Sequence, residues 1–104
     1  MVYKVVVTAD AEEDLNRFVS YLLYEKKSAQ AAAQVLDDFA ITAQSLAHVA
    51  GSLKLCDNPK LRALGYRRIQ FLSHRYCMLY RIENELVIVD RIFHALQDYE
   101  NKLF

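Results

Sequence analysis

The chain shows two hydrophobic periods, that of β-strands at both ends and that of α-helices between them. Residues 2–8, VYKVVVT, form a β-branched run of strand length. Three later runs rich in Val, Ile, Phe and Tyr predict strands at Tyr66–Leu72, Tyr76–Ile82 and Leu86–Phe93. The breaks between these three runs are short and polar, whereas parallel strands would need a crossover of about a dozen or more residues. We therefore expect an antiparallel meander.

A first helix is predicted directly after the opening strand. Asp10 is its expected N-cap, and Glu13, three positions further on, would close a capping box. Apolar residues then follow at the helical spacing i, i+3, i+4, i+7 and i+8, which predicts one stripe facing a core. The stripe consists of Leu15, Phe18, Val19, Leu22 and Leu23.

A second helix is predicted from Ala29 to about Val49, with Ser28 as its N-cap and Gly51 at the C′ position. Its apolar stripe consists of Ala32, Val35, Leu36, Phe39, Ala43, Leu46 and Ala47. The gap between the two helices is so short that they must form an antiparallel hairpin. Residues 52–64, which include Pro59, are expected to form a structured loop against the body of the protein.

These elements predict a single α+β domain, residues 1–104, in the order β-α-α-β-β-β. We expect a mainly antiparallel four-stranded sheet with the two-helix hairpin packed on one face. The residues expected to be mostly buried are Leu15, Phe18, Leu22, Val35, Leu36, Phe39, Leu46, Ile69, Phe71, Leu79, Val87 and Val89.

The formal net charge is zero, but the charges are unevenly distributed along the chain. Residues 54–81 carry seven cations and one acid, a net charge of +6. A neutral protein with one basic segment suits a localised anionic partner, although a solvated basic loop is an equal alternative for residues 54–62. The loop alternative is weaker for arginines within strands, because a charge there must face solvent, a partner or a buried counter-charge. These are Arg67, Arg68, Arg81 and Arg91.

Several classes of function lack support in the sequence. No apolar run approaches the ~20 residues of a membrane span, and the N-terminus lacks a signal-peptide pattern, so a cytoplasmic protein without a membrane partner is expected. Cys56 and Cys77 lack the spacing of a zinc site or disulfide framework, and the three histidines lack ligand spacing. With only two glycines there is no phosphate loop. We expect no metal, no cofactor and no small-molecule substrate.

Metal-free RNA cleavage needs few groups: a base for the ribose 2′-OH, cations for the phosphorane and an acid for the leaving oxygen. His94 and Tyr99 are candidates for proton transfer, and Arg68 is a candidate for the phosphate. The alternative for His94 is a strand-end histidine bonded to the backbone. The alternative for Tyr99 is an aromatic residue that packs the tail down. Residue by residue, these structural roles are favoured.

The last forty residues resemble the RelE/ParE superfamily, the toxins of type II toxin–antitoxin modules. The resemblance is carried by Gly65-x-Arg67-x-Ile69, Tyr76, Met78-Leu79-Tyr80-Arg81-Ile82, Val87–Val89 and Arg91-Ile92-Phe93-His94 followed by Asp98. It implies the β-α-α-β-β-β toxin fold, growth inhibition, a role in plasmid stabilisation, and a cognate acidic antitoxin that folds on binding. Four arginines are expected to bind the target or the antitoxin: Arg67, Arg75, Arg81 and Arg91.

Two branches of this superfamily act on different targets. RelE-like nucleases cut mRNA on the ribosome and carry alternating basic residues on the first meander strand, where this chain has Arg68, Gln70 and Leu72. They also carry an arginine before a tyrosine in the tail, where this chain has Asp98 and Tyr99. The pattern at residues 91–94 is most similar to ParE toxins, which inhibit DNA gyrase by binding. Gyrase is therefore the favoured target, the ribosome with mRNA is the alternative, and an inert relative is the third interpretation.

Overall fold

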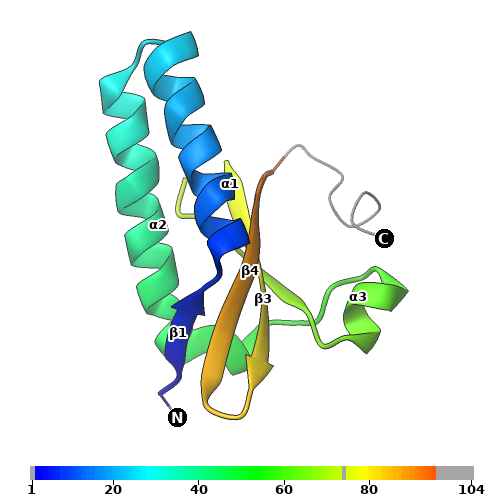
Figure 1. Cartoon of the computed structure of the whole chain (residues 1–104). Helices are drawn as coiled ribbons and strands as arrows, with labels where there is room; N and C mark the ends of the chain where they lie inside the picture. The colour runs from blue at the N-terminus through cyan, green and yellow to red at the C-terminus, as the bar shows by residue number, and fades with distance from the viewer. Residues whose placement is uncertain (1, 74, 96–104) are drawn as a thin grey trace.

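A mixed four-stranded sheet carries a hairpin of two long helices on one face (Figure 1). The computed structural model describes residues 2–73 and 75–95. The strands are β1 (Lys4–Val7), β2 (Arg67–Gln70), β3 (Tyr76–Glu83) and β4 (Leu86–His94). The helices are α1 (Ala9–Ser20), α2 (Ala29–Val49) and α3 (Pro59–Ala63). A π-helical turn, Tyr21–Glu25, extends α1, and a 3₁₀ turn, Ala50–Ser52, follows α2.

The strand order is β1-β4-β3-β2, so the first strand lies beside the last. β2, β3 and β4 form the predicted antiparallel meander. β1 pairs with β4 in parallel, with Lys4 opposite Leu86 and Val7 opposite Val89. The α+β class, the order of elements and the mainly antiparallel sheet are thus confirmed.

The N-cap predicted for α1 was wrong. Thr8, in place of Asp10, is the N-cap, and its hydroxyl oxygen accepts a hydrogen bond from the Ala11 N–H at 3.2 Å. Ser28 caps α2 as predicted and accepts from the Ala31 N–H at 3.1 Å. Thr8 was overlooked because its β-branched side chain also fits the end of the opening strand.

The main core lies between the sheet and the hairpin. Its fully buried members include Leu46, Phe71, Met78, Tyr80, Val87, Val89 and Ile92. Phe18, Leu22, Phe39 and Ile69 are partly buried and pack against this cluster. Leu36 was predicted to be buried, but it is 45% exposed. It lies at the edge of the apolar stripe of α2, which is wider than the surface that the sheet can cover.

The other face of the sheet is partly covered by residues 53–66. Here a second cluster of buried side chains joins Cys56 and Leu61 to Cys77, Leu79 and Phe93. Both cysteine side chains are buried, as expected. The predicted loop contains the short helix α3, which Asn58 caps by accepting hydrogen bonds from the N–H groups of Lys60 and Leu61. Gly65 follows α3 with φ +83°, the left-handed conformation that favours glycine after a helix.

The end of α2 is fixed by contacts with two strands. The Tyr80 hydroxyl donates to the Ala50 carbonyl oxygen at 2.8 Å, and burial raises the pKa of Tyr80 to about 12. Gly51 also leaves room for Tyr3: a Cβ atom there would lie 2.8 Å from the Tyr3 hydroxyl oxygen, so the Tyr3 side chain would have to shift. Gly51 occupies the predicted C′ position after the C-cap Ala50, but its φ is not positive, because a 3₁₀ turn continues from α2 there.

A pair of neighbouring substitutions tests the register of this fold. Phe71 is fully buried, whereas Leu72 is 63% exposed. We expect Phe71→Ala to lower the free energy of unfolding by about 3–5 kcal/mol through lost transfer energy and a cavity. Leu72→Ala, the matched control, should change it by less than ~0.5 kcal/mol. Urea unfolding followed by circular dichroism measures both, and equal losses would contradict the assigned faces.

Candidate functional site

A buried carboxylate on α1 organises the edge of the sheet. Asp14 is 1% exposed. Its oxygens accept hydrogen bonds from the Arg91 Nε at 2.8 Å, from the Arg91 Nη2 at 3.2 Å and from the backbone N–H of Ile92 at 3.0 Å. Arg17, one turn further along α1, also pairs with Asp14. The carboxylate is therefore fully paired, as a buried charge must be.

This contact closes a strand edge that β1 leaves open. β1 ends at Val7, opposite Val89, whereas β4 continues beyond that point. Thr8 donates from its backbone N–H to the Val89 carbonyl oxygen at 3.0 Å and from its hydroxyl to the Asp90 carbonyl oxygen at 3.1 Å. The Asp14 carboxylate then accepts the next available backbone donor of β4. Side chains around the start of α1 thus replace the missing strand partner.

A second acid lies at a β-bulge of β4. The register shifts between Leu79 and Tyr80, and Asp90 is the extra residue on the opposite strand. Its carboxylate accepts a hydrogen bond from the Tyr66 hydroxyl at 2.7 Å and from the Arg81 Nε at 3.0 Å. Burial is the main cause that raises the pKa of Tyr66, and the hydrogen bond to Asp90 raises it further. This cluster ties the segment before β2 to the central strands.

Three of the four arginines predicted to bind a partner have contacts within the fold. Arg67 donates to the carbonyl oxygen of Leu53. Arg81 pairs with Glu83 as well as with Asp90. Arg91 pairs with Asp14, and that hydrogen bond raises the pKa of Arg91 above its ordinary value. Their role in binding stays a prediction, because part of each side chain reaches the surface.

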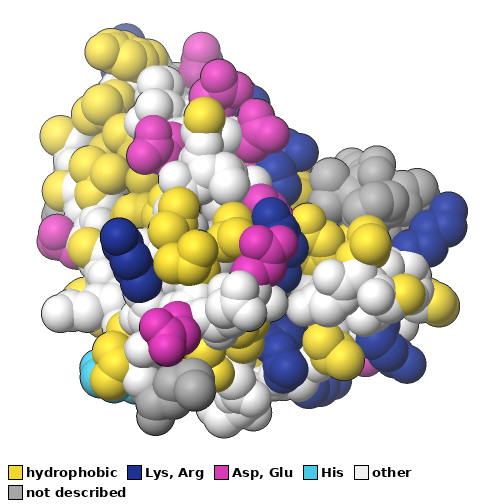
Figure 2. Space-filling view, turned by 60° about the horizontal axis from the view of Figure 1, so that its bottom comes forward, with side chains coloured by type: hydrophobic (Ala, Val, Ile, Leu, Met, Phe, Trp, Pro, Cys, Tyr) yellow, Lys and Arg dark blue, Asp and Glu magenta, His cyan; other side chains and the backbone are white. Residues whose placement is uncertain are grey.

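Arg75 differs from these three arginines. It is exposed, and its guanidinium forms no hydrogen bond or ion pair with the residues that the structure describes. It follows the β2–β3 turn and lines a cavity beneath the helical hairpin. In Figure 2, apolar side chains gather on the hairpin side of the molecule, while several Lys and Arg side chains lie on the α3 side. Of the four arginines predicted to bind a partner, Arg75 is thus the one whose charge is most available.

Arg68 lies on the edge strand β2 beside a second cavity. This cavity has a volume of about 320 Å³ and is lined by Leu53, Lys54, Arg68, Ile69 and Gln70. Arg68 and Lys54 could bind an anion there. Arg68 is paired in register with Leu79, a member of the second buried cluster. Because side chains alternate along a strand, Arg68 lies on the α3-covered face of the sheet.

His94 lies on the opposite, hairpin-covered face. It pairs in register with Tyr76, and the two rings meet edge to face with centroids 5.3 Å apart. Tyr76 belongs to the main core. The described structure therefore does not bring His94 and Arg68, two of the three predicted catalytic residues, onto one face. The third, Tyr99, lies outside the described residues, as does the neighbouring Asp98.

Over residues 2–73 and 75–95, no group of three or more His, Cys, Asp or Glu side chains is placed to hold a metal ion. In the same ranges, no helix is long and apolar enough to cross a membrane.

Asp14 and Asp90 are the polar residues that sequence analysis missed. Sequence analysis gave Asp14 no role in the site. Its spacing from Ala11 and Phe18, three and four positions, places it on the buried face of the helix. That spacing was the available signal. Asp90 gave none, because a β-bulge is not visible in the hydrophobic pattern of β4.

Solved structures with the same architecture are toxin proteins. The ParDE system of P. aeruginosa has a TM-score of 0.70 at 16% identity, over 90% of this chain and 97% of that chain. The RelBE2 complex of Mycobacterium tuberculosis has a TM-score of 0.59 at 22% identity, over 90% and 99%. A double mutant of E. coli RelE in the free state has a TM-score of 0.55 at 15% identity, over 98% and 93%. No curated protein sequence matches the chain.

The four-stranded mixed sheet under a helical hairpin matches the RelE/ParE class of toxin folds. The model of one family, described as the ParE toxin of the type II toxin–antitoxin system parDE, matches residues 5–99. The chain therefore belongs to the ParE toxin family.

The Asp14 contact yields a stability prediction. Asp14→Ala removes the acceptor for the buried Ile92 N–H and the counter-charge of Arg91. An unsatisfied buried donor alone typically costs about 1–3 kcal/mol, so we expect a loss of at least that size. Glu13→Ala, an exposed acid on the same helix, is the matched control and should stay within ~0.5 kcal/mol. Thermal or urea unfolding measures both.

A double-mutant cycle with Arg91→Ala separates the ion pair from the backbone contact. If Asp14 acts mainly through Arg91, the double variant should lose little more than the larger single loss. Additive losses would show that Asp14 and Arg91 stabilise the fold independently.

Proposed function

We propose that this chain is the toxin of a type II toxin–antitoxin module, that it arrests growth by binding DNA gyrase, and that a cognate antitoxin neutralises it. The observation that carries the proposal is membership of the ParE toxin family over residues 5–99. The antitoxin is supported by the solved relatives, which are described as a ParDE system and a RelBE2 toxin–antitoxin complex.

The arrangement of polar groups favours inhibition by binding over RNA cleavage. A nuclease needs a proton-transfer group and a cation near the same phosphate. Here the alternation of the strands places His94 and Arg68 on opposite faces of the sheet. Gln70 and Leu72 also stand where RelE-like nucleases carry cations. Losing one pre-organised charge contact typically raises a barrier by ~2.7–4 kcal/mol, or about 10²–10³ in rate.

RelE-like cleavage of mRNA on the ribosome is the second candidate function. The observation that favours it is the cavity at β2, where Lys54 and Arg68 lie close enough to line one space. Two cations at one site can bind a phosphate of the RNA backbone. This candidate requires a proton-transfer group on the same face as Arg68.

Expression of the toxin should arrest growth, and co-expression of its neutralising partner should restore it. The partner to be tested is the product of the small open reading frame next to the gene. Colony counts after induction measure both effects, with soluble expression checked by immunoblot. Unimpaired growth with soluble protein present would favour the third interpretation, an inert relative of the toxins.

Two parallel assays with one purified preparation distinguish the targets. We expect the chain to inhibit supercoiling by DNA gyrase and to leave mRNA on translating ribosomes uncut, as mapped by primer extension. His94→Ala should leave inhibition of gyrase within about twofold, because His94 packs edge to face on the core residue Tyr76. Defined ribosomal cuts that disappear in His94→Ala would instead identify the protein as a nuclease.

A further inference from the structure

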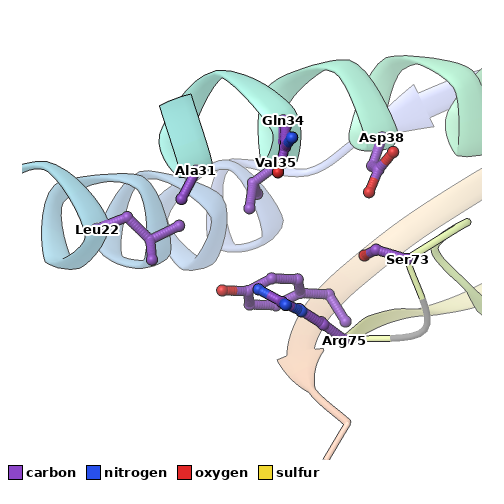
Figure 3. Close-up of a pocket in the computed structure, with 8 residues that line it drawn as sticks. Leu22, Ala31, Gln34, Val35, Asp38, Ser73 and Arg75 are labelled. Atoms are coloured by element: carbon purple, nitrogen blue, oxygen red, sulfur yellow. The ribbon is translucent and has the colours of Figure 1, made fainter. Parts of the chain in front are cut away.

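A small cavity lies between the helical hairpin and the β2–β3 turn (Figure 3). Its volume is about 200 Å³. Leu22, Ala31, Val35 and Tyr76 provide apolar wall surface. Asp38 on α2 and Arg75 beside the turn line opposite sides of the opening. Gln34 on α2 and Ser73 in the turn complete the lining. We refer to this cavity, defined by these eight residues, as the Arg75 pocket.

The size of the Arg75 pocket restricts what it can hold. Pockets for small-molecule ligands usually have volumes of ~300–1,000 Å³. At about 200 Å³, this cavity is too small to enclose most metabolites. Its apolar lining nevertheless suits one large side chain of a partner protein, because a buried apolar anchor in a well-packed pocket is a common source of binding energy.

The polar groups of the Arg75 pocket indicate the charge of the partner. Arg75 forms no hydrogen bond or ion pair with the described residues, so its guanidinium is available for a carboxylate. The Tyr76 hydroxyl is protonated at neutral pH, as tyrosine ordinarily is, and can donate a hydrogen bond; burial raises its pKa further. Asp38, on the α2 side, would repel a second acid. The pocket therefore selects a partner with an acid on the Arg75 side only.

We propose that the Arg75 pocket binds the cognate antitoxin, receiving one large apolar side chain while Arg75 pairs with an adjacent Asp or Glu. This inference rests on the proposed function and adds the binding site and the chemistry of the bound segment. The binding segment combines an apolar anchor with an acid within about one turn. A second copy of this chain or a segment of gyrase are the other possible occupants, and the experiment below distinguishes them.

The first test fills the pocket. Ala31→Phe places an aromatic ring in the wall of the cavity, whereas Ala33→Phe places the same ring on an exposed position of the same helix. The probe is the purified product of the adjacent small open reading frame, and titration calorimetry measures its Kd. We expect Ala31→Phe to weaken binding at least about tenfold and Ala33→Phe to change it less than about threefold. Circular dichroism melts confirm that both variants fold.

The second test removes the charge. Arg75→Gln should weaken antitoxin binding about five- to thirtyfold and should flatten the dependence of Kd on salt. Lys60→Gln removes an exposed cation on α3, far from the pocket lining, and is the matched control. Both variants keep the apolar wall residues unchanged.

The outcomes separate this inference from the proposed function. If the wild-type chain does not bind the probe, the proposed antitoxin partner is wrong and the pocket assignment falls with it. If the wild-type chain binds and Ala31→Phe and Arg75→Gln bind equally well, only the pocket assignment is wrong. A loss with Ala33→Phe in place of Ala31→Phe would move the antitoxin to the outer face of α2. Intact antitoxin binding with loss of gyrase inhibition or of self-association would assign the pocket to that other occupant.

Discussion

The fold depends on how the Asp14 carboxylate completes the sheet edge. One buried side chain accepts hydrogen bonds from a backbone N–H of β4 and from the Arg91 guanidinium, and Arg17 also pairs with it. The same contact attaches the first helix to the last strand, two elements that are far apart in the sequence. Without it, β4 would extend past β1 with an unpaired backbone donor at Ile92, and α1 would lose its ion pair with β4. The N-terminal and C-terminal parts of the domain are joined mainly by electrostatics at this point and by β pairing beside it.

The sequence predicted the elements well because their signals are local. Ser28 and the apolar spacing of α2 give both the start and the orientation of that helix. The short polar breaks of the meander fix its antiparallel pairing. The parallel pairing of β1 with β4 has no comparable local signal, since the two strands are far apart in the sequence and meet only in the folded domain. The bulge at Asp90 and the covering helix α3 likewise follow from tertiary contacts, and Leu36 is exposed because the sheet covers only part of the apolar face of α2.

The candidate site was less predictable for a physical reason. An arginine in a strand pattern can pair with an acid of its own fold or with a partner, and sequence alone does not distinguish these cases. Here Arg81 and Arg91 form ion pairs with internal carboxylates, whereas Arg75 shares its cavity with Asp38 and forms no ion pair with it or with any other described residue. Side chains alternate between the two faces of a sheet along each strand, and only groups on the same face can act on one substrate. That alternation places Arg68 and His94 on opposite faces of the sheet.

The parallel pairing of β1 with β4 also determines when the domain can finish folding during synthesis. Lys4 pairs with Leu86, so the first strand has no partner until almost the whole chain has been made. At ~5–20 residues per second, synthesis of the intervening chain takes about 4–16 s. During that interval the helical hairpin can form from local contacts, but the sheet cannot close. A chain that ends before β4 has neither a complete sheet nor the Asp14 contact, so the fold cannot be completed until β4 has been made.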